Sequence, residues 1–145
     1  MSTQIDKKNL KNCACKNLRM TSRVLTQYYD KMLQPAGLRS TQFTLLVDIS
    51  SREDSTIGEL ADLLLMDQTT VTRNVEILKK NGFIDVRISE EDSRRRCITI
   101  TEDGRNKLID ALPLWEKAQL YVEQGIGKEK FQEFLNILTD IQRII

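Results

Sequence analysis

Hydrophobic residues recur through most of the chain at the spacing that an α-helix requires, every third or fourth position. In the N-terminal part this series consists of Leu10, Ala14, Leu18, Leu25, Tyr28, Met32 and Leu33. The pattern predicts one long helix over residues 10–33. The helix should end before Pro35, because proline removes a backbone donor and clashes with the preceding helical turn.

Three shorter helices are predicted next, and each has a recognisable start. Ser40 or Thr41 is placed to cap the first, which runs through the apolar stretch FTLLVDIS. Thr56 and Glu59 have the spacing of a capping box ahead of the second helix. Asp67 stands where an N-cap belongs for the third, QTTVTRNVEILKK.

After Gly82 the spacing changes from helical to alternating. Apolar residues then occupy every second position in two short runs, Ile84, Val86 and Ile88, and Ile98 and Ile100. Period-two alternation is typical of β-strands, so we predict a hairpin whose strands are joined by a long charged loop.

Two further helices are predicted after the hairpin. Thr101 is placed to cap the first of them, and Gly125 and Gly127 separate it from the second. The last helix carries a continuous apolar stripe of Phe131, Phe134, Leu135, Leu138, Ile141, Ile144 and Ile145. This stripe can pack inside the chain or against a partner subunit. We favour the partner, because the first and the last two helices carry more apolar surface than one small domain needs.

The order of these elements predicts a mainly α-helical protein with a small β-hairpin. A helix, a short turn, a capped helix and a hairpin with a charged tip form a winged helix-turn-helix lobe, here over residues 38–101. Residues 10–33 and 105–145 would form a helical dimerisation region, and the whole of 1–145 a single domain. The chain has no apolar run long enough for a membrane span and no secretory signal, so we expect a cytoplasmic protein.

Composition narrows the possible functions. The chain contains no histidine, which removes the usual general base, the usual nucleophile pairs and most zinc sites, so we expect neither an enzyme nor a cofactor or metal. The net charge is +1, but it is unevenly distributed. Residues 1–33 carry seven basic residues against two acids, and residues 68–107 carry nine against seven. Basic charge gathered in two stretches is compatible with a nucleic-acid partner.

The helix that begins after Asp67 carries the candidate DNA-reading residues. Its apolar stripe of Val71, Val75 and Leu78 faces inward. The outward positions hold mainly amide, hydroxyl and guanidinium groups, which can bond base edges and phosphates. We expect DNA contacts from Gln68, Thr69, Thr70, Thr72, Arg73 and Asn74.

The loop between the strands, SEEDSRRR, places acids directly before three arginines. A wing tip beside a recognition helix lies over the minor groove, which favours arginine. We predict that Arg94 enters that groove and that the Asp92 carboxylate holds its guanidinium by a two-pronged contact. Arg95 and Arg96 would reach phosphates or stay in solvent.

The sequence resembles the MarR-type (multiple antibiotic resistance regulator) transcription factors over essentially its whole length. The resemblance rests on GLRSTQFTLL, TIGELADLLLMDQTTVTRNVEILKKNGFI and DSRRRCITITEDG. It implies a homodimer with two winged lobes that represses transcription from near-palindromic double-stranded operators until a small molecule or an oxidant releases it. Asp92 and Arg94 fall on the family's wing motif, and residues 68–73 on its base-reading helix.

Two groups of residues could receive that signal. Tyr28, Tyr29, Phe43 and Trp115 could line a pocket for a small aromatic or lipophilic effector, of the kind the family often binds, or form ordinary core. Cys13 and Cys15 could be redox sensors, as a cysteine near the N-terminus is in some members of the family. We favour buried apolar packing for both cysteines, because in a continuous helix they point about 200° apart.

Two other functions are compatible with parts of the sequence pattern. A winged-helix protein–protein adaptor would show acidic or apolar residues on the recognition helix and no arginine at the wing tip, unlike Arg73 and Arg94. A thiol-redox enzyme built on Cys13-Ala14-Cys15 would need a turn at a helix start, whereas the pattern predicts the middle of a helix.

Overall fold

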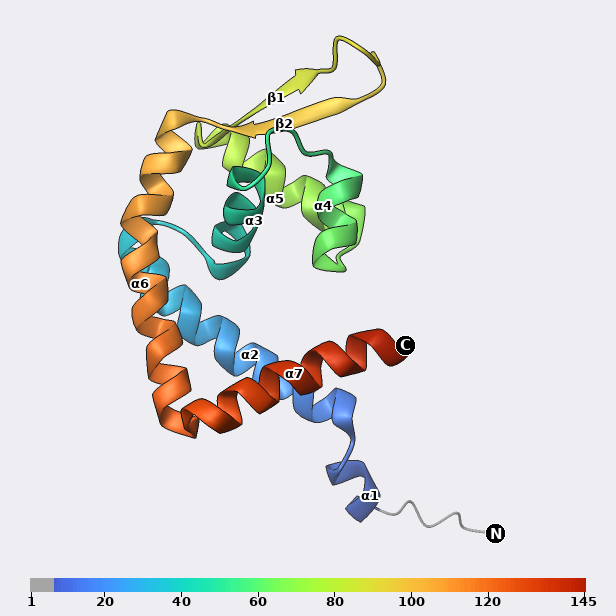
Figure 1. The fold of residues 1–145 in the computed structure, drawn as a ribbon, viewed down its shortest axis with the longest axis vertical. Helices are drawn as coiled ribbons and strands as arrows, with labels where there is room; N and C mark the ends of the chain where they lie inside the picture. The colour runs from blue at the N-terminus through green and yellow to red at the C-terminus, as the bar shows by residue number, and fades with distance from the viewer. Residues whose placement is uncertain (1–6) are drawn as a thin grey trace.

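The computed structural model describes residues 7–145 and has a winged lobe at one end and a helical region at the other (Figure 1). A two-stranded sheet stands above three helices of the lobe, and two long helices run away from them. The elements are α1 (Lys7–Lys11), α2 (Ala14–Leu33), the 3-10 turn η1 (Gln34–Ala36), α3 (Ser40–Ser50), α4 (Ile57–Leu64), α5 (Gln68–Lys80), β1 (Ile84–Ile88), β2 (Arg96–Ile100), α6 (Glu102–Ile126) and α7 (Lys128–Ile144).

The prediction of one unbroken N-terminal helix is wrong at residues 12–13, where the chain separates α1 from α2. Cys13 is extended, with φ −64° and ψ 116°, and takes the N-cap position of α2. The Asn17 side-chain amide donates to the Lys11 carbonyl at 2.8 Å and to the Cys13 carbonyl at 2.9 Å. A polar side chain that bonds the backbone in this way offers it an alternative to the helical ladder. The spacing of apolar residues does not reveal this break.

The core of the winged lobe is formed where α3, α4, α5 and the hairpin meet. Each element contributes the apolar face that its sequence pattern predicts, and the side chains are almost completely inaccessible to solvent. The core consists of Leu45, Leu46, Ile49, Leu60, Ala61, Val71, Val75, Leu78, Ile84 and Ile98. A second cluster connects the lobe to the helical region through Leu33, Ala36, Leu38, Phe43 and Ala111.

Two of the three predicted starts of the lobe helices are confirmed. The Thr56 hydroxyl accepts from the Glu59 N–H at 3.1 Å, and a Glu59 carboxylate oxygen accepts from the Thr56 N–H at 3.3 Å, completing the capping box. Asp67 Oδ1 accepts from the Thr70 N–H at 2.8 Å. The predicted cap of α3 is wrong, because Ser40 is already helical and its N–H donates to Asp30 Oδ1 at 2.7 Å.

The hairpin is antiparallel, as predicted, and it is held to the lobe by more than its own two strands. Ile84 is opposite Ile100 and Ile88 is opposite Arg96. Ser55, just before α4, forms an additional antiparallel bridge to Ile98 through N–O contacts of 3.2 and 2.7 Å. The root of the wing is therefore fixed to the segment that starts α4.

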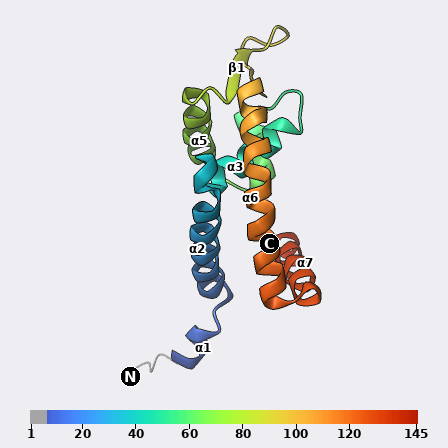
Figure 2. The ribbon, with the colours of Figure 1, turned by 90° about the vertical axis from the view of Figure 1, so that its left-hand side faces the viewer.

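Helix α6 begins directly after the wing and extends to the far end of the molecule. Thr101 caps it as predicted, accepting from the Gly104 N–H at 3.0 Å. The helices α2 and α7 lie on the two sides of α6 (Figure 2), and of the apolar stripe predicted for α7 only Phe131 is buried. Among the described residues, much of the apolar surface of α2, α6 and α7 is thus open in the single chain.

Candidate nucleic-acid interface

The outer face of α5 presents four of the six predicted DNA-reading residues directly to solvent. Gln68, Thr69, Thr72 and Arg73 are exposed. They are in the first two turns of the helix, opposite the buried Val71. These side chains are free to reach base edges and phosphates.

Thr70 and Asn74 are half-buried and already bonded within the helix. The Thr70 hydroxyl donates to the Asp67 carboxylate at 3.0 Å, and the Asn74 amide donates to the Thr70 carbonyl at 2.9 Å. Backbone and side-chain bonds from Thr70 hold the pKa of the Asp67 carboxyl below its ordinary value. Both residues thus support the start of α5. Asp67 was predicted only as the N-cap, and sequence reasoning missed that it also holds Thr70 of the candidate interface.

The wing tip differs from the predicted arrangement of Asp92 and Arg94. Asp92 Oδ1 accepts from the backbone N–H of Arg94 at 3.0 Å, and the Asp92 carbonyl accepts from the Arg95 N–H at 3.0 Å. Among residues 7–145 no two-pronged contact joins the Asp92 carboxylate to the Arg94 guanidinium. The carboxylate shapes the backbone of the loop, a role typical of aspartate in tight turns. Arg94 is exposed.

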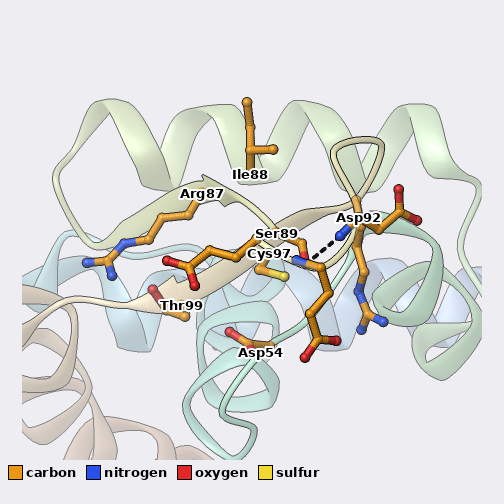
Figure 3. Close-up of a pocket in the computed structure, with 10 residues that line it drawn as sticks. Asp54, Arg87, Ile88, Ser89, Asp92, Cys97 and Thr99 are labelled. Carbon is orange, nitrogen blue, oxygen red and sulfur yellow. Dashed lines mark hydrogen bonds between the residues drawn. The ribbon is translucent and has the colours of Figure 1, made fainter.

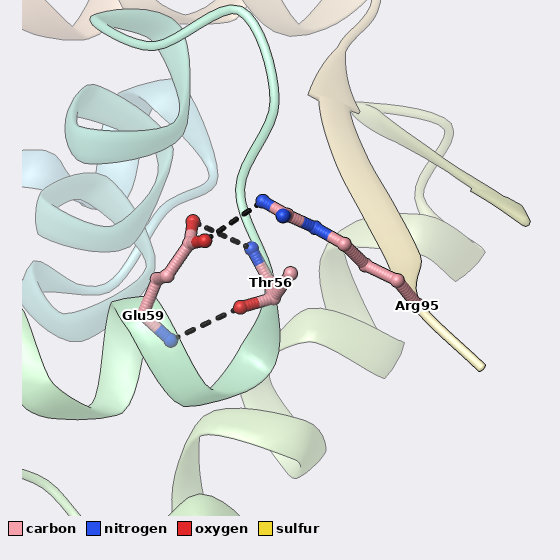
Figure 4. Close-up of polar contacts among 3 residues, drawn as sticks. All are labelled: Thr56, Glu59 and Arg95. Atoms are coloured by element: carbon pink, nitrogen blue, oxygen red, sulfur yellow. Dashed lines mark hydrogen bonds and ion pairs between the residues drawn. The ribbon is translucent and has the colours of Figure 1, made fainter. Parts of the chain in front are cut away.

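Arg95 is exposed and is also bonded to the lobe, a contact that the prediction of a solvated or phosphate-bound side chain did not include. Its guanidinium Nη2 lies 2.8 Å from Glu59 Oε1, across 36 residues of sequence (Figure 4). Glu59 was predicted as a helix-capping residue, and sequence reasoning missed its contact with the wing. Arg96 is exposed at the start of β2, as predicted.

The three acids of the loop line a hollow on one face of the wing. This 470 Å³ cavity lies between the strands and the loop before α4, and Asp54, Glu90, Glu91, Asp92, Arg95 and Cys97 are among its lining residues (Figure 3). Arg94 and Arg96 are not among the residues that line it. The acids and two of the arginines therefore occupy different parts of the wing.

Three of the four predicted effector-pocket residues come together between the lobe and the helical region. Tyr29, Phe43 and Trp115 line a pocket of 250 Å³, with the Phe43 and Trp115 rings stacked at 6.1 Å. Burial and the neighbouring Tyr28 raise the pKa of the Tyr29 phenol, whose hydroxyl donates to Gln119 Oε1 at 2.6 Å. Tyr28 does not line the pocket and lies against Tyr121 at 5.3 Å.

The two N-terminal cysteines lie at the start of α2, not within a continuous helix. Cys13 is half-buried and Cys15 is exposed, so the expectation of buried apolar packing is wrong for Cys15. The opposed directions calculated for a continuous helix do not apply, because Cys13 precedes the first helical residue. All three cysteines are free thiols.

Over residues 7–145, histidine, cysteine and acidic side chains form no group of three that could hold a metal ion. Within the same range, no helix combines the length and the apolar character needed to cross a membrane.

A helix-turn-helix with an exposed polar recognition helix, followed by a hairpin with arginines at its tip, defines a winged helix-turn-helix DNA-binding protein. The sequence model of the MarR family matches residues 38–96. A solved regulator that is 35% identical covers 90% of this chain, and the chain covers 97% of it. The chain belongs to the MarR family, and it is a DNA-binding transcription regulator, not an enzyme.

Individual relatives agree with this assignment. The solved regulator is MosR of M. tuberculosis in complex with DNA, which superposes with a TM-score of 0.78. The organic hydroperoxide resistance transcriptional regulator of Bacillus subtilis is 29% identical over 113 residues, 76% of this chain and 77% of the relative. The repressor CouR bound to a 23-mer DNA duplex has a TM-score of 0.86 at 18% identity, with 97% and 99% of the two chains covered, and it supports the fold alone.

Proposed function

We propose that the protein is a cytoplasmic homodimeric repressor that reads a near-palindromic duplex with two copies of α5 and of the wing. The observation that carries the proposal is the exposed row of Gln68, Thr72 and Arg73 on the same lobe as the exposed Arg94. In such lobes the recognition helix reads the major groove while a basic arm reads the adjacent minor groove. A winged-helix protein–protein adaptor would not require this combination of residues.

Selection of bound fragments from random-sequence duplex DNA tests the proposal. The selected fragments should contain two half-sites with centres about 10 bp, one helical turn, apart. Arg73→Ala should weaken binding to the selected duplex by about 1–3 kcal/mol if the guanidinium reads a base. Equal losses on selected and on random duplexes would assign Arg73 to a phosphate, and failure to enrich any sequence would refute specific binding.

The open apolar surface supports the dimer. A groove of 330 Å³ runs between α2, α6 and α7 and is lined by Leu18, Leu25, Phe131, Phe134, Leu135 and Leu138 among others. Ile144 at the end of α7 is 81% exposed. Exposed apolar patches of this kind mark protein–protein interfaces. A second copy of the chain would cover them.

A small aromatic or lipophilic molecule in the pocket of Tyr29, Phe43 and Trp115 is the first candidate for the releasing signal. The pocket volume of 250 Å³ exceeds the roughly 150 Å³ apolar cavity that holds benzene, so one ring with a small substituent fits. The pocket joins α2 and α6 to α3, so its occupant would contact both the helical region and the lobe.

Thiol oxidation is a second candidate, favoured by the break between α1 and α2. The break leaves Cys13 and Cys15 at an accessible helix start. A hydroperoxide would convert one thiolate to sulfenic acid and leave as an alcohol, and the other thiol would then form a disulfide and release water. The relative in Bacillus subtilis carries organic hydroperoxide resistance in its name.

One experiment separates the two signals. DNA release is measured with cumene hydroperoxide and, separately, with a panel of monocyclic aromatic acids, for wild type, Cys13→Ser, Cys15→Ser and the pocket variant Trp115→Leu. Loss of peroxide-induced release in either serine variant would support the thiol signal. Loss of acid-induced release in Trp115→Leu alone would support the pocket.

A further inference from the structure

The carboxylate of Glu59 is shared between the start of α4 and the wing. Its Oε2 accepts from the Thr56 N–H at 3.3 Å, and its Oε1 accepts from the Arg95 guanidinium at 2.8 Å (Figure 4). Glu59 has a defined position because the capping box fixes its backbone and one of its oxygens. The other oxygen therefore offers Arg95 an anchor that belongs to the helix-turn-helix itself.

Besides the apolar contacts of Ile84 and Ile98 with the core, two polar contacts attach the β2 side of the wing to the lobe. The inner point is the backbone bridge between Ser55 and Ile98. The outer point is Arg95, three residues nearer the tip, about 10 Å further along an extended strand. Attachment at the root alone would leave the outer part of the hairpin able to bend, whereas the contact of Arg95 near the tip defines the direction in which the tip points.

The backbone of Arg95 also closes the loop that carries the other arginines. Its carbonyl accepts from the Ser89 N–H at 2.8 Å, and its N–H donates to the Asp92 carbonyl at 3.0 Å. A shift of Arg95 would therefore move both Ser89 and Asp92, and with them the loop that presents Arg94.

The charges around Arg95 favour Glu59 over DNA as its partner. Arg95 lines the hollow that also contains Asp54, Glu91 and Asp92. These acids attract the guanidinium and repel phosphates. The two side chains of the ion pair are 47% and 39% exposed, so solvent screens it and it adds little to the free energy of unfolding.

We propose that Glu59 and Arg95 are positioning residues: their ion pair sets the angle of the wing relative to α5, so that Arg94 reaches the minor groove when α5 is in the major groove. The proposal rests on the DNA-binding function proposed above. It has an unusual consequence, because an acid on the DNA-binding lobe then strengthens binding to a polyanion.

Glu59→Gln is the informative variant. Glutamine is accepted at this position of a capping box, so the helix start is kept while the charge pair is lost. Affinity is measured for the duplex selected from random DNA, with wild type, Glu59→Gln, Arg95→Gln and the double variant. We expect each single variant to bind about two- to fivefold more weakly, the range for an exposed ion pair, and the double variant to bind no more weakly than either. Combining Glu59→Gln with Arg96→Gln is the matched control, and those losses should multiply.

Two further measurements separate positioning from direct contact. If Arg95 bound a phosphate, Arg95→Gln would reduce the slope of log affinity against log salt by about 0.9 more than Glu59→Gln does, whereas loss of a positioning pair changes the slope equally in the two variants. On a duplex truncated to exclude the flanks that the wing reaches, Glu59→Gln should bind as wild type does.

Several results would overturn the proposal. Tighter binding by Glu59→Gln, multiplied losses in the Glu59→Gln Arg95→Gln variant, or a salt slope reduced in Arg95→Gln but not in Glu59→Gln would make Arg95 a phosphate ligand. An equal loss on the truncated duplex would make the effect one of general lobe stability. These results leave wild-type binding intact, whereas a wild-type protein that enriches no sequence would refute both the proposed function and the positioning role of Glu59 and Arg95.

Discussion

At the scale of single residues, Gly104 decides how closely α6 approaches the wing. Its Cα lies against the Phe83 carbonyl, and a Cβ added there would collide with that oxygen and lie 2.8 Å from Ile100 Cγ1. The Phe83 carbonyl also accepts from the Thr101 N–H at 3.0 Å, so it cannot move without breaking that bond. The φ of Gly104 is not in the left-handed region, so backbone conformation does not require glycine here. The requirement comes from the close packing against Phe83 and Ile100.

Gly104→Ala should therefore destabilise the protein by about 1–3 kcal/mol, as overpacking of a tight site does. Gly125 near the end of the same helix is the matched control, because a Cβ there would meet no atom within 4 Å. Gly125→Ala should be neutral or stabilising by up to about 1 kcal/mol, since alanine is the better helix former. Urea unfolding at one fixed protein concentration compares the variants. Equal stability of the two would contradict the close contact at Gly104.

At the scale of elements, the shape of the wing tip depends on Asp92, and Arg94 is the residue proposed to contact DNA. Arg94→Ala should cost most on duplexes with A·T-rich flanks, because an inserted arginine reads the narrow groove of such sequences. Asp92→Ala should reproduce part of that loss although it removes an acid, because the Arg94 N–H loses its acceptor. Asp92→Asn keeps a side-chain oxygen and should bind at least as well as wild type.

Binding titrations at matched salt show whether Asp92 acts through the shape of the loop or through its charge. If Asp92→Ala binds more tightly than wild type, simple charge repulsion dominates at the tip and the turn is unimportant. If Asp92→Asn is as weak as Asp92→Ala, the negative charge itself is needed, and the backbone bond is not the reason.

Much of the fold could be predicted because its signals are local. The capping box of Thr56 and Glu59 and the cap at Asp67 each join residues three positions apart, and the alternation around Ile98 is read from neighbouring positions. The contact between Arg95 and Glu59 could not be predicted, since it joins side chains 36 positions apart. The break before α2 depends on the side chain of Asn17 reaching six residues back to Lys11, which apolar spacing does not encode.

The candidate site could be predicted only in part, because helical periodicity shows which side of a helix faces outward but not which partners its side chains bond. Helical periodicity identified which side of α5 faces outward, and Gln68 and Arg73 are exposed as expected. Periodicity could not show that Thr70 and Asn74 are bonded within their own helix. Nor could it separate Tyr28 from Tyr29, whose rings lie at 87° to one another and meet different neighbours.

At the scale of the whole molecule, the open groove between α2, α6 and α7 predicts how the subunits separate. Leu138 lines that groove, so Leu138→Glu should dissociate or unfold the dimer, because an unpaired buried charge costs several kcal/mol. Asn136→Glu, two residues away on the same helix and exposed, is the control and should leave the dimer intact. Sedimentation at micromolar concentration measures both. A wild-type monomer at that concentration would refute the dimer.

Helix α6 has the length and the position of a lever arm. It spans 25 residues from the root of the wing to the turn before α7, which at 1.5 Å per residue is about 37 Å. A tilt of about 5° at the α7 end would displace the other end by about 3 Å over that length. In a dimer the two displacements add, and the recognition helices must stay in step with a DNA repeat of about 34 Å. We therefore predict that a slight change of packing far from the DNA is magnified into a mismatch of half-site spacing, while each lobe keeps its internal structure.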